Sequence, residues 1–299
     1  MGSKSLVDLV IFDLGGTVCD GIDEATGLAN VGPINALKFS IKEVWDIDPD
    51  YDVILPHMAT RKLDHLHKIL STPSIAEEFK EKHGRPPTFE DAEKTFNTAF
   101  KRILEIDEMP GRSEPFEGVI DMFEGLRGKD ILIGINTGFY AKAVRIILAN
   151  FGHNHLIEAD CGADEVSQAR PFPYMMFKIM DDLGVADVHR VMKVGDVYPV
   201  DFLEGYNLGG YSVGLTECGN TRPASAWKPM VHNGRELRPV EWFESSLSDK
   251  EALFKDWLRE SADNGTRLPY PMILIPHSNQ LIKLIDEMEQ IEDLISSFI

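Results

Sequence analysis

An apolar run that stops at an aspartate limits the folds open to this chain. The run extends from Val7 to Phe12, interrupted only by Asp8, and Asp13 and the pair Gly15-Gly16 follow it. Such a run is typical of a short buried strand in a parallel sheet, ended here by the glycines. Because ligands of open α/β sheets bind at the carboxyl ends of the strands, Asp13 is expected at a binding edge. There it acts as a nucleophile or a metal ligand, unless the segment is an ordinary strand and turn.

Size and composition exclude several classes of partner. The chain has 299 residues, 43% of them hydrophobic, which suffices for one large or two modest domains. Its net charge of −19 argues against nucleic acid and anionic membranes, since both require a basic surface, but permits a small anionic substrate. We see no apolar run that could span a membrane and no targeting segment. The three dispersed cysteines, Cys19, Cys161 and Cys218, fit a reducing, cytoplasmic location.

The apolar spacing predicts a helical block followed by alternating helices and strands. Residues 25–109 read as helical, with helices at 53–71, 74–83 and 88–107 and no strand. Strands are then expected at 130–135, 157–161, 191–194 and 211–215, and helices at 119–126, 141–150, 173–183 and 199–208. This alternation predicts a doubly wound parallel sheet with right-handed crossovers. The fold class is therefore α/β, with an all-helical cap inserted after the first strand.

The domain organisation follows from this pattern. Residues 1–24 and 110–299 are expected to form the α/β core, and residues 25–109 the cap. Within the core, residues 217–265 read as an irregular extra segment, apart from a helix at 248–260. A final strand is expected at 270–275, at an edge of the sheet because Pro271 cannot donate a ladder hydrogen bond. A helix from about residue 278 ends the chain.

Other polar groups lie after predicted strands or before a predicted helix, and we expect them to lie close to Asp13 in the fold. Asn136-Thr137 ends one strand, Arg170 precedes a helix, and Asp196 ends another strand with Asp201 five residues later. Because the carboxyl ends of parallel strands share one edge, these groups are expected to converge. Phosphoryl transfer on Mg²⁺ requires positioning and charge neutralisation, which a hydroxyl, a cation and several carboxylates provide.

In this order the groups resemble those of the haloacid dehalogenase superfamily. The resemblance implies that Asp13 attacks phosphorus. It also implies a set of binding residues: Mg²⁺ held by Asp13, the Gly15 carbonyl, Asp196 and Asp201, and substrate bound by Gly16, Thr17, Asn136, Thr137 and Arg170. Most phosphatases of the superfamily carry an acid/base aspartate where this chain has Gly15. Since glycine cannot transfer protons, hydrolysis of ordinary phosphate esters is disfavoured.

A stretch of the predicted cap offers a substitute for the missing aspartate. If residues 53–71 form one helix, Met58, Lys62 and His65 share a face beside the one that packs on the cap core. On a helix alone, a lysine usually points into solvent. However, Met58–His65 (MATRKLDH) resembles the Met-Gly-x-x-Lys-x-Asp-His cap helix of phosphonoacetaldehyde hydrolases, with Ala59 in place of glycine. Residues 170–174 (RPFPY) and 193–196 (KVGD) resemble two further motifs of that family.

The resemblance implies hydrolysis of the carbon–phosphorus bond of phosphonoacetaldehyde. Lys62 would form a Schiff base with the aldehyde, Asp13 would take the phosphoryl group, and His65 and Met58 would assist proton transfer and place the imine. Because imine formation requires a neutral amine, the pKa of Lys62 should lie well below the value of about 10.4 for free lysine. The family also implies a homodimer formed through the cap.

Three other hypotheses about the function remain open. The chain could be another Mg²⁺-dependent phosphatase of the superfamily that acts on a small phosphorylated metabolite. It could be a dehalogenase, although a dehalogenase needs no metal ligand such as Asp196. It could also be a non-catalytic binding protein that uses residues 217–265 as its partner surface.

Overall fold

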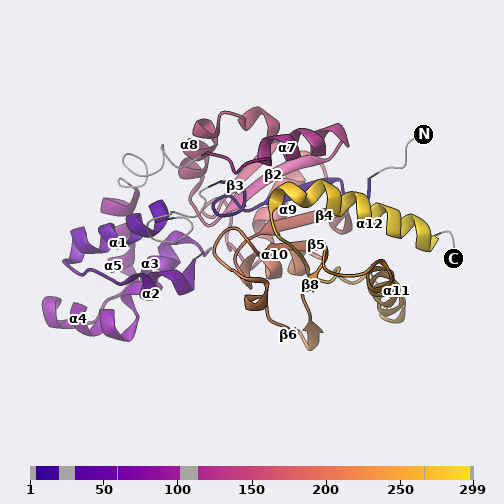
Figure 1. Cartoon of the computed structure of the whole chain (residues 1–299). Coiled ribbons are helices and arrows are strands. Elements are labelled where there is room, and N and C mark those ends of the chain that lie inside the picture. Colours follow the sequence, from indigo (N-terminus) through magenta and orange to yellow (C-terminus); the bar gives the residue numbers. More distant parts are fainter. Residues whose placement is uncertain (1–4, 20–30, 59, 102–113, 266, 297–299) are drawn as a thin grey trace.

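A helical cap lies at one end of an α/β core (Figure 1). The structure is a computed structural model and describes residues 5–19, 31–58, 60–101, 114–265 and 267–296. The core contains a seven-stranded sheet in the order β3-β2-β1-β4-β5-β9-β8, and every pair is parallel. Its strands are β1 Leu9–Phe12, β2 Leu132–Thr137, β3 Ala159–Gly162, β4 Val191–Gly195, β5 Tyr211–Leu215, β8 Val240–Glu241 and β9 Ile273–Ile275. The predicted fold class is confirmed.

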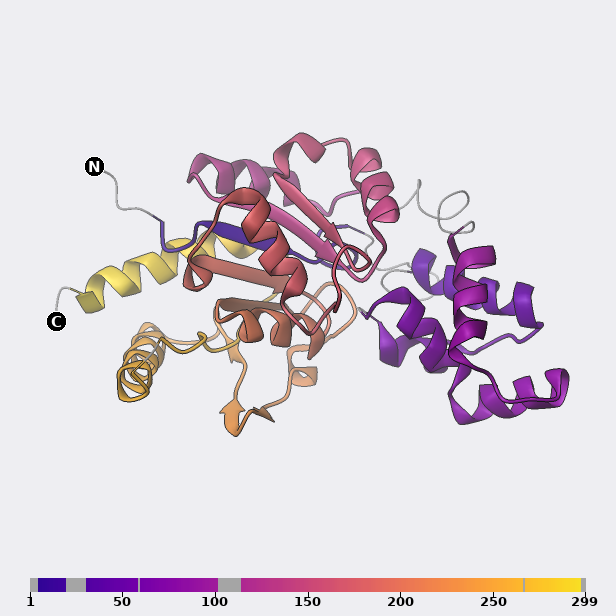
Figure 2. The ribbon, with the colours of Figure 1, turned by 180° about the vertical axis from the view of Figure 1, so that it is seen from behind.

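Strand β1 lies in the middle of the sheet, which explains its continuous apolar run. Its four residues are fully buried between β2 and β4. Val10 and Phe12 belong to the core cluster under α7 Val119–Gly128, α8 Ala141–Phe151 and α12 Leu281–Ser296. Leu9 and Ile11 face the opposite side and belong to the cluster under α9 Tyr174–Leu183. Helix α12 crosses the near face in Figure 1, and the reverse view in Figure 2 shows the other face, which α9 and α10 Val200–Leu208 cover.

In the C-terminal part of the core, the predicted helix at 248–260 is confirmed by α11 Leu247–Asp263, but two other predictions are wrong. Residues 217–246 are not wholly irregular: β6 Met230–His232 and β7 Arg235–Leu237 form an antiparallel hairpin, and β8 joins the main sheet. Strand β9 is not an edge strand, because β8 pairs outside it. Pro271 precedes β9 and therefore removes no hydrogen bond from its ladder.

The cap consists of the helices between residues 31 and 101. They are α1 Val31–Trp45, α2 Tyr51–Ile54, α3 Lys62–Leu70, α4 Pro73–His83 and α5 Phe89–Thr95, followed by a π-helical turn at Phe96–Phe100. The described cap residues contain no strand. The predicted domain boundaries near residues 24 and 109 lie outside the described residues, as does Ala59.

The single helix predicted at 53–71 is wrong, since Met58, Thr60 and Arg61 are not helical. Helix α2 continues into a short 3₁₀ turn, Leu55–His57, and Met58 and Arg61 then have extended ψ angles of 159° and 129°. The backbone N–H of Lys62 donates to the core carbonyl of Gly138 at 3.3 Å instead of to the preceding turn. The break brings the first residue of α3 against the core.

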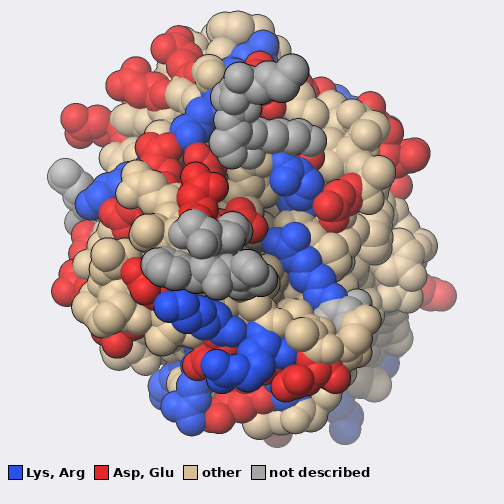
Figure 3. Space-filling model, turned by 90° about the vertical axis from the view of Figure 1, so that its right-hand side faces the viewer, with Lys and Arg blue, Asp and Glu red and all other residues tan. Residues whose placement is uncertain are grey.

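Charges of both signs are mixed over the end of the molecule opposite the cap. Lys and Arg side chains there are interspersed with Asp and Glu side chains (Figure 3). In the described part of the chain, no helix combines the length and the apolar character needed to cross a membrane.

Candidate active site

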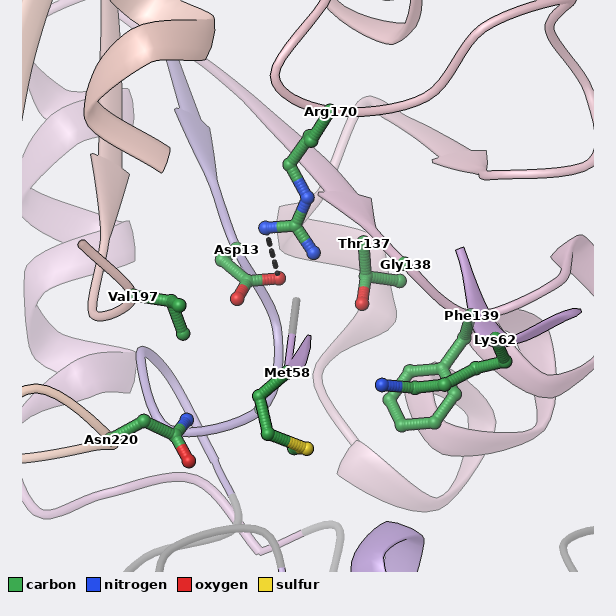
Figure 4. A pocket seen from close by; sticks show the side chains of 10 residues that line it. Asp13, Met58, Lys62, Thr137, Gly138, Phe139, Arg170, Val197 and Asn220 are labelled. Carbon is green, nitrogen blue, oxygen red and sulfur yellow. Dashed lines mark ion pairs between the residues drawn. The ribbon is translucent and has the colours of Figure 1, made fainter. Parts of the chain in front are cut away.

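A small cavity lies at the carboxyl end of β1, beneath the cap (Figure 4). Its volume is about 20 Å³, close to the space that a single water molecule needs, so the cap in this position leaves little room for a substrate. The lining residues come from both parts of the molecule: Asp13, Gly15, Met58, Lys62, Thr137, Gly138, Phe139, Arg170, Val197 and Asn220. Six of them were predicted as site residues from the sequence.

Three buried carboxylates form an acidic cluster beside the cavity. Asp13, Asp196 and Asp201 each offer an oxygen, and these oxygens lie within 4.8 Å of one another. Position 195 must be glycine, because a Cβ there would collide with the Asp201 carboxylate. Burial, and then the charges of Asp13 and Asp201, raise the pKa of Asp196 to about 7. Crowded oxygen donors that carry this much negative charge fit Mg²⁺, so these residues could hold that ion.

Two buried cations offset part of this charge. Arg170 has a side chain that is 1% exposed; its Nη1 lies 3.1 Å from Asp13 Oδ1 and also donates to Asp201 Oδ1. Burial alone would lower the pKa of Arg170, but the two carboxylates raise it, so the guanidinium stays charged. Lys193 Nζ lies 3.5 Å from Asp201 Oδ1 and 3.2 Å from Glu204 Oε2. The cation of Arg170 is therefore fixed beside the candidate nucleophile.

Lys62 reaches the cavity from the cap side. It is 4% exposed, and its Nζ lies 5.1 Å from the centre of the Phe139 ring. Figure 4 shows its amine directed toward the space beside Met58 and Thr137. Burial and then the charge of Arg170 lower the pKa of Lys62 to about 8, and Asp13 opposes them weakly. A substantial fraction of this amine is therefore neutral at mildly alkaline pH, as the sequence led us to expect.

His65 is fully buried one turn along α3. Its Nε2 lies 2.7 Å from the carbonyl oxygen of Ile54, which can only accept, so Nε2 carries the proton. Burial and the charge of Lys62 keep the pKa of His65 well below its usual value. Its Nδ1 is therefore an acceptor, and no described residue donates to it. Met58, 6% exposed, lines the cavity from the cap.

Three residues predicted to bind substrate have other partners. The Thr17 hydroxyl donates to Asp196 Oδ1 at 2.9 Å, and the Gly16 N–H donates to the Cys19 carbonyl at 2.7 Å. The Asn136 amide donates to Glu204 Oε1 at 2.8 Å and accepts from Lys193. None of the three lines the cavity. The contact of Thr17 supports the acidic cluster, those of Asn136 support Lys193 and Glu204, and that of Gly16 closes the turn after β1.

Neither Asn220 nor the pairing of Lys193 with Glu204 was predicted from the sequence. Asn220 lines the cavity from the segment that was expected to be irregular, and no periodic pattern or motif marks it. Glu204 is fully buried on α10 against Lys193 of β4. Lys193 and Glu204 each interrupt an otherwise apolar segment, and this was the signal available in the sequence. Buried charges require partners, so a lysine and a glutamate in such segments could have been expected to pair.

Comparison with known proteins agrees with this geometry. Residues 7–203 match a family model described as haloacid dehalogenase-like hydrolase. The chain is 30% identical over 234 residues to the phosphonoacetaldehyde hydrolase of Parabacteroides distasonis, covering 75% of this chain and 88% of that protein. It is 29% identical over 223 residues to the phosphonoacetaldehyde hydrolase of Vibrio vulnificus, covering 73% and 78%.

Solved structures share the fold over nearly the whole chain. A phosphonoacetaldehyde hydrolase-like protein from Oleispira antarctica superposes with a TM-score of 0.70 at 21% identity, covering 96% of this chain and 95% of that one. A putative phosphoglycolate phosphatase from Lactobacillus delbrueckii superposes with a TM-score of 0.60 at 13% identity, covering 94% and 98%. The alignment with the Oleispira antarctica protein covers 96% of this chain, so it must include most of residues 217–265. This segment therefore belongs to the shared fold.

Proposed function

We propose a specific reaction for this chain, which belongs to the phosphonoacetaldehyde hydrolases among the haloacid dehalogenase-like hydrolases and is thus an enzyme. The proposed reaction is hydrolysis of the carbon–phosphorus bond of phosphonoacetaldehyde to acetaldehyde and phosphate. One observation carries the proposal: the buried amine of Lys62 and the carboxylate of Asp13 line one cavity, in which Gly15 leaves no second carboxylate. In this proposal residues 1–24 and 110–299 form the hydrolase core and residues 25–109 the cap.

Substrate binding would use the cation before α9 and the hydroxyl at the end of β2. Arg170 and Thr137, which both line the cavity, would hold phosphonate oxygens. Asp13, Asp196 and Asp201 would hold Mg²⁺, with the Gly15 carbonyl as a further ligand. When bound, Mg²⁺ would neutralise charge on the phosphonate oxygens.

The first chemical step would occur at Lys62. Its neutral Nζ attacks the aldehyde carbon to give a carbinolamine. The carbinolamine hydroxyl takes up one proton and leaves as water, which leaves a protonated imine between Lys62 and the substrate. Carbon is otherwise a poor leaving group from phosphorus, and the imine provides an acceptor for the electron pair of the breaking bond. His65 would assist proton transfer through its Nδ1, and Met58 would place the imine against the cavity wall.

Asp13 would then take the phosphoryl group. Its carboxylate oxygen bonds to phosphorus, the carbon–phosphorus bond breaks, and its electron pair forms the double bond of an enamine on Lys62. Protonation of the enamine carbon and attack by water release acetaldehyde and restore the lysine. A second water hydrolyses the acyl phosphate, which releases phosphate and restores Asp13.

A substrate comparison tests this proposal against the other hydrolases. We expect phosphate release from phosphonoacetaldehyde, and none from ethylphosphonate, which has the same bond but no aldehyde. Faster release from small phosphate monoesters would favour the alternative phosphatase. Metal-independent halide release from a haloacid would favour a dehalogenase.

The pKa of Lys62 predicts the pH dependence of imine formation. Below about pH 8 the amine is protonated and cannot attack, so trapping of the imine by cyanoborohydride should rise with pH through a midpoint near 8 and then level off. The measurement is the rate of irreversible inactivation by phosphonoacetaldehyde and cyanoborohydride at each pH. A midpoint near 10, the value of an ordinary lysine, would show that burial does not activate Lys62.

Removal of divalent cations should separate the two steps. Chelation is expected to lower phosphate release by at least about 10²-fold, because the phosphonate charge is then uncompensated, and Mg²⁺ should restore it. Imine trapping on Lys62 should survive chelation, since Lys62 belongs to the cap and not to the acidic cluster. Unchanged phosphate release in chelator would contradict the assignment of the cluster to Mg²⁺.

We further propose a homodimer formed through the cap and a cytoplasmic location. Phe39 on α1 and Phe89 on α5 are 44% and 41% exposed, which supports an apolar contact by the cap. The three cysteines are buried thiols, as suits a reducing compartment. Sedimentation of the wild type and of Phe39→Glu would test the dimer.

A further inference from the structure

The loop after β5 places its backbone directly against Asp196. The Asn220 backbone N–H donates to Asp196 Oδ2 at 2.6 Å, and Asn220 Nδ2 donates to the same oxygen at 2.7 Å. The next residue, Thr221, donates its backbone N–H to the Asp196 carbonyl at 3.0 Å. Two successive residues of this loop therefore hold Asp196 at both its side chain and its backbone.

Gly219 shows how close the approach is. Its φ of +77° is a conformation that favours glycine, and a Cβ at this position would collide with the Asp196 carboxylate. On the other side of the carboxylate, the Thr17 hydroxyl donates to Oδ1 at 2.9 Å. Both oxygens of Asp196 are thus fixed, and the carboxylate cannot rotate without breaking hydrogen bonds in a fully buried site.

We propose that Asn220 is a positioning residue of the metal site, which holds the Asp196 carboxylate in the orientation that binds a divalent cation. This inference rests on the proposed Mg²⁺ site, and it gives a function to the start of the 217–265 segment. Groups that hydrogen-bond to metal ligands fix the orientation of those ligands, and their loss typically weakens metal binding by about 10- to 100-fold. Asn220 supplies both donors to Oδ2, and the side-chain donor can be removed by a substitution that leaves the backbone donor in place.

The test is a Mn²⁺ titration of the full-length protein without substrate, with free Mn²⁺ measured by electron paramagnetic resonance. Asn220→Leu keeps the approximate size of the side chain and removes its donor, and it should weaken Mn²⁺ binding about tenfold. Thr221→Val is the matched control. It disturbs the same loop by removing the acceptor of the Tyr198 N–H, at 3.0 Å, but takes no donor from Asp196, so its affinity should stay within about twofold of wild type.

Three outcomes would overturn the inference. Asn220→Leu could bind Mn²⁺ as tightly as wild type, Thr221→Val could weaken binding as much as Asn220→Leu, or the wild-type protein could bind no Mn²⁺. Because the titration contains no substrate, an enzyme that failed to cleave phosphonoacetaldehyde could still show the expected loss. Failure of the proposed reaction and failure of this inference are therefore distinguishable.

Discussion

Lys62→Arg is expected to lower phosphate release from phosphonoacetaldehyde by at least about 10³-fold, which corresponds to about 4 kcal/mol of transition-state stabilisation. The guanidinium of arginine stays protonated and cannot form an imine, so the carbon–phosphorus bond would have to break without an acceptor for its electron pair. The measurement is steady-state phosphate release at saturating Mg²⁺. Borohydride should no longer inactivate the variant in the presence of substrate.

The fold should tolerate this substitution. No described carboxylate forms an ion pair with Lys62, and its backbone hydrogen bond to Gly138 does not depend on the side chain. Lys68→Arg provides a matched control, because it makes the same chemical change at an exposed position of α3. It should retain wild-type activity. Full carbon–phosphorus cleavage by Lys62→Arg would rule out the imine mechanism.

Asp13→Asn is expected to reduce phosphate release by about 10³- to 10⁴-fold, because the amide that replaces the carboxylate is not a nucleophile toward phosphorus. Asparagine has nearly the shape of aspartate, and Arg170 keeps its other partner, Asp201, so the cavity should persist. Lys62 should still form its imine in this variant. Phosphate release and borohydride inactivation, measured on the same preparation, separate the two steps.

The pair of variants distinguishes the roles of the two residues. If Asp13→Asn retained phosphate release, water would attack phosphorus directly and no aspartyl phosphate would form. If it lost imine trapping as well, Asp13 would be required for substrate binding. Lys62→Arg should lose both trapping and release.

The candidate residues of the core could be predicted because their positions depend on local pattern alone. Thr137 ends an apolar strand, and Asp13 and Asp196 each follow one directly. Parallel strands bring their carboxyl ends to one edge whatever the details of packing. The position of β1 could be predicted in the same way, since a central strand that is covered on both faces needs a continuous apolar run. These features required no knowledge of contacts between distant segments.

The parts that could not be predicted depend on tertiary contacts. The helix break before Lys62 is accompanied by a hydrogen bond to Gly138 of the core, and the local sequence has no sufficient breaker in residues 58–61. The two-residue strand β8 is too short to show alternation, so β9 was misplaced at the edge. Asn220 acts through Asp196, which lies 24 residues earlier in the chain.

Peptide mapping after borohydride reduction tests the central role of Lys62 most directly. Wild-type protein and Asp13→Asn would each be incubated with phosphonoacetaldehyde, reduced, digested and analysed by mass spectrometry. We expect an ethyl group on Lys62 in the wild type, where the carbon–phosphorus bond has broken, and a phosphonoethyl group on Lys62 in Asp13→Asn, where it has not. A wild-type protein that releases phosphate but carries no adduct on Lys62, or carries it on another lysine, would contradict the mechanism.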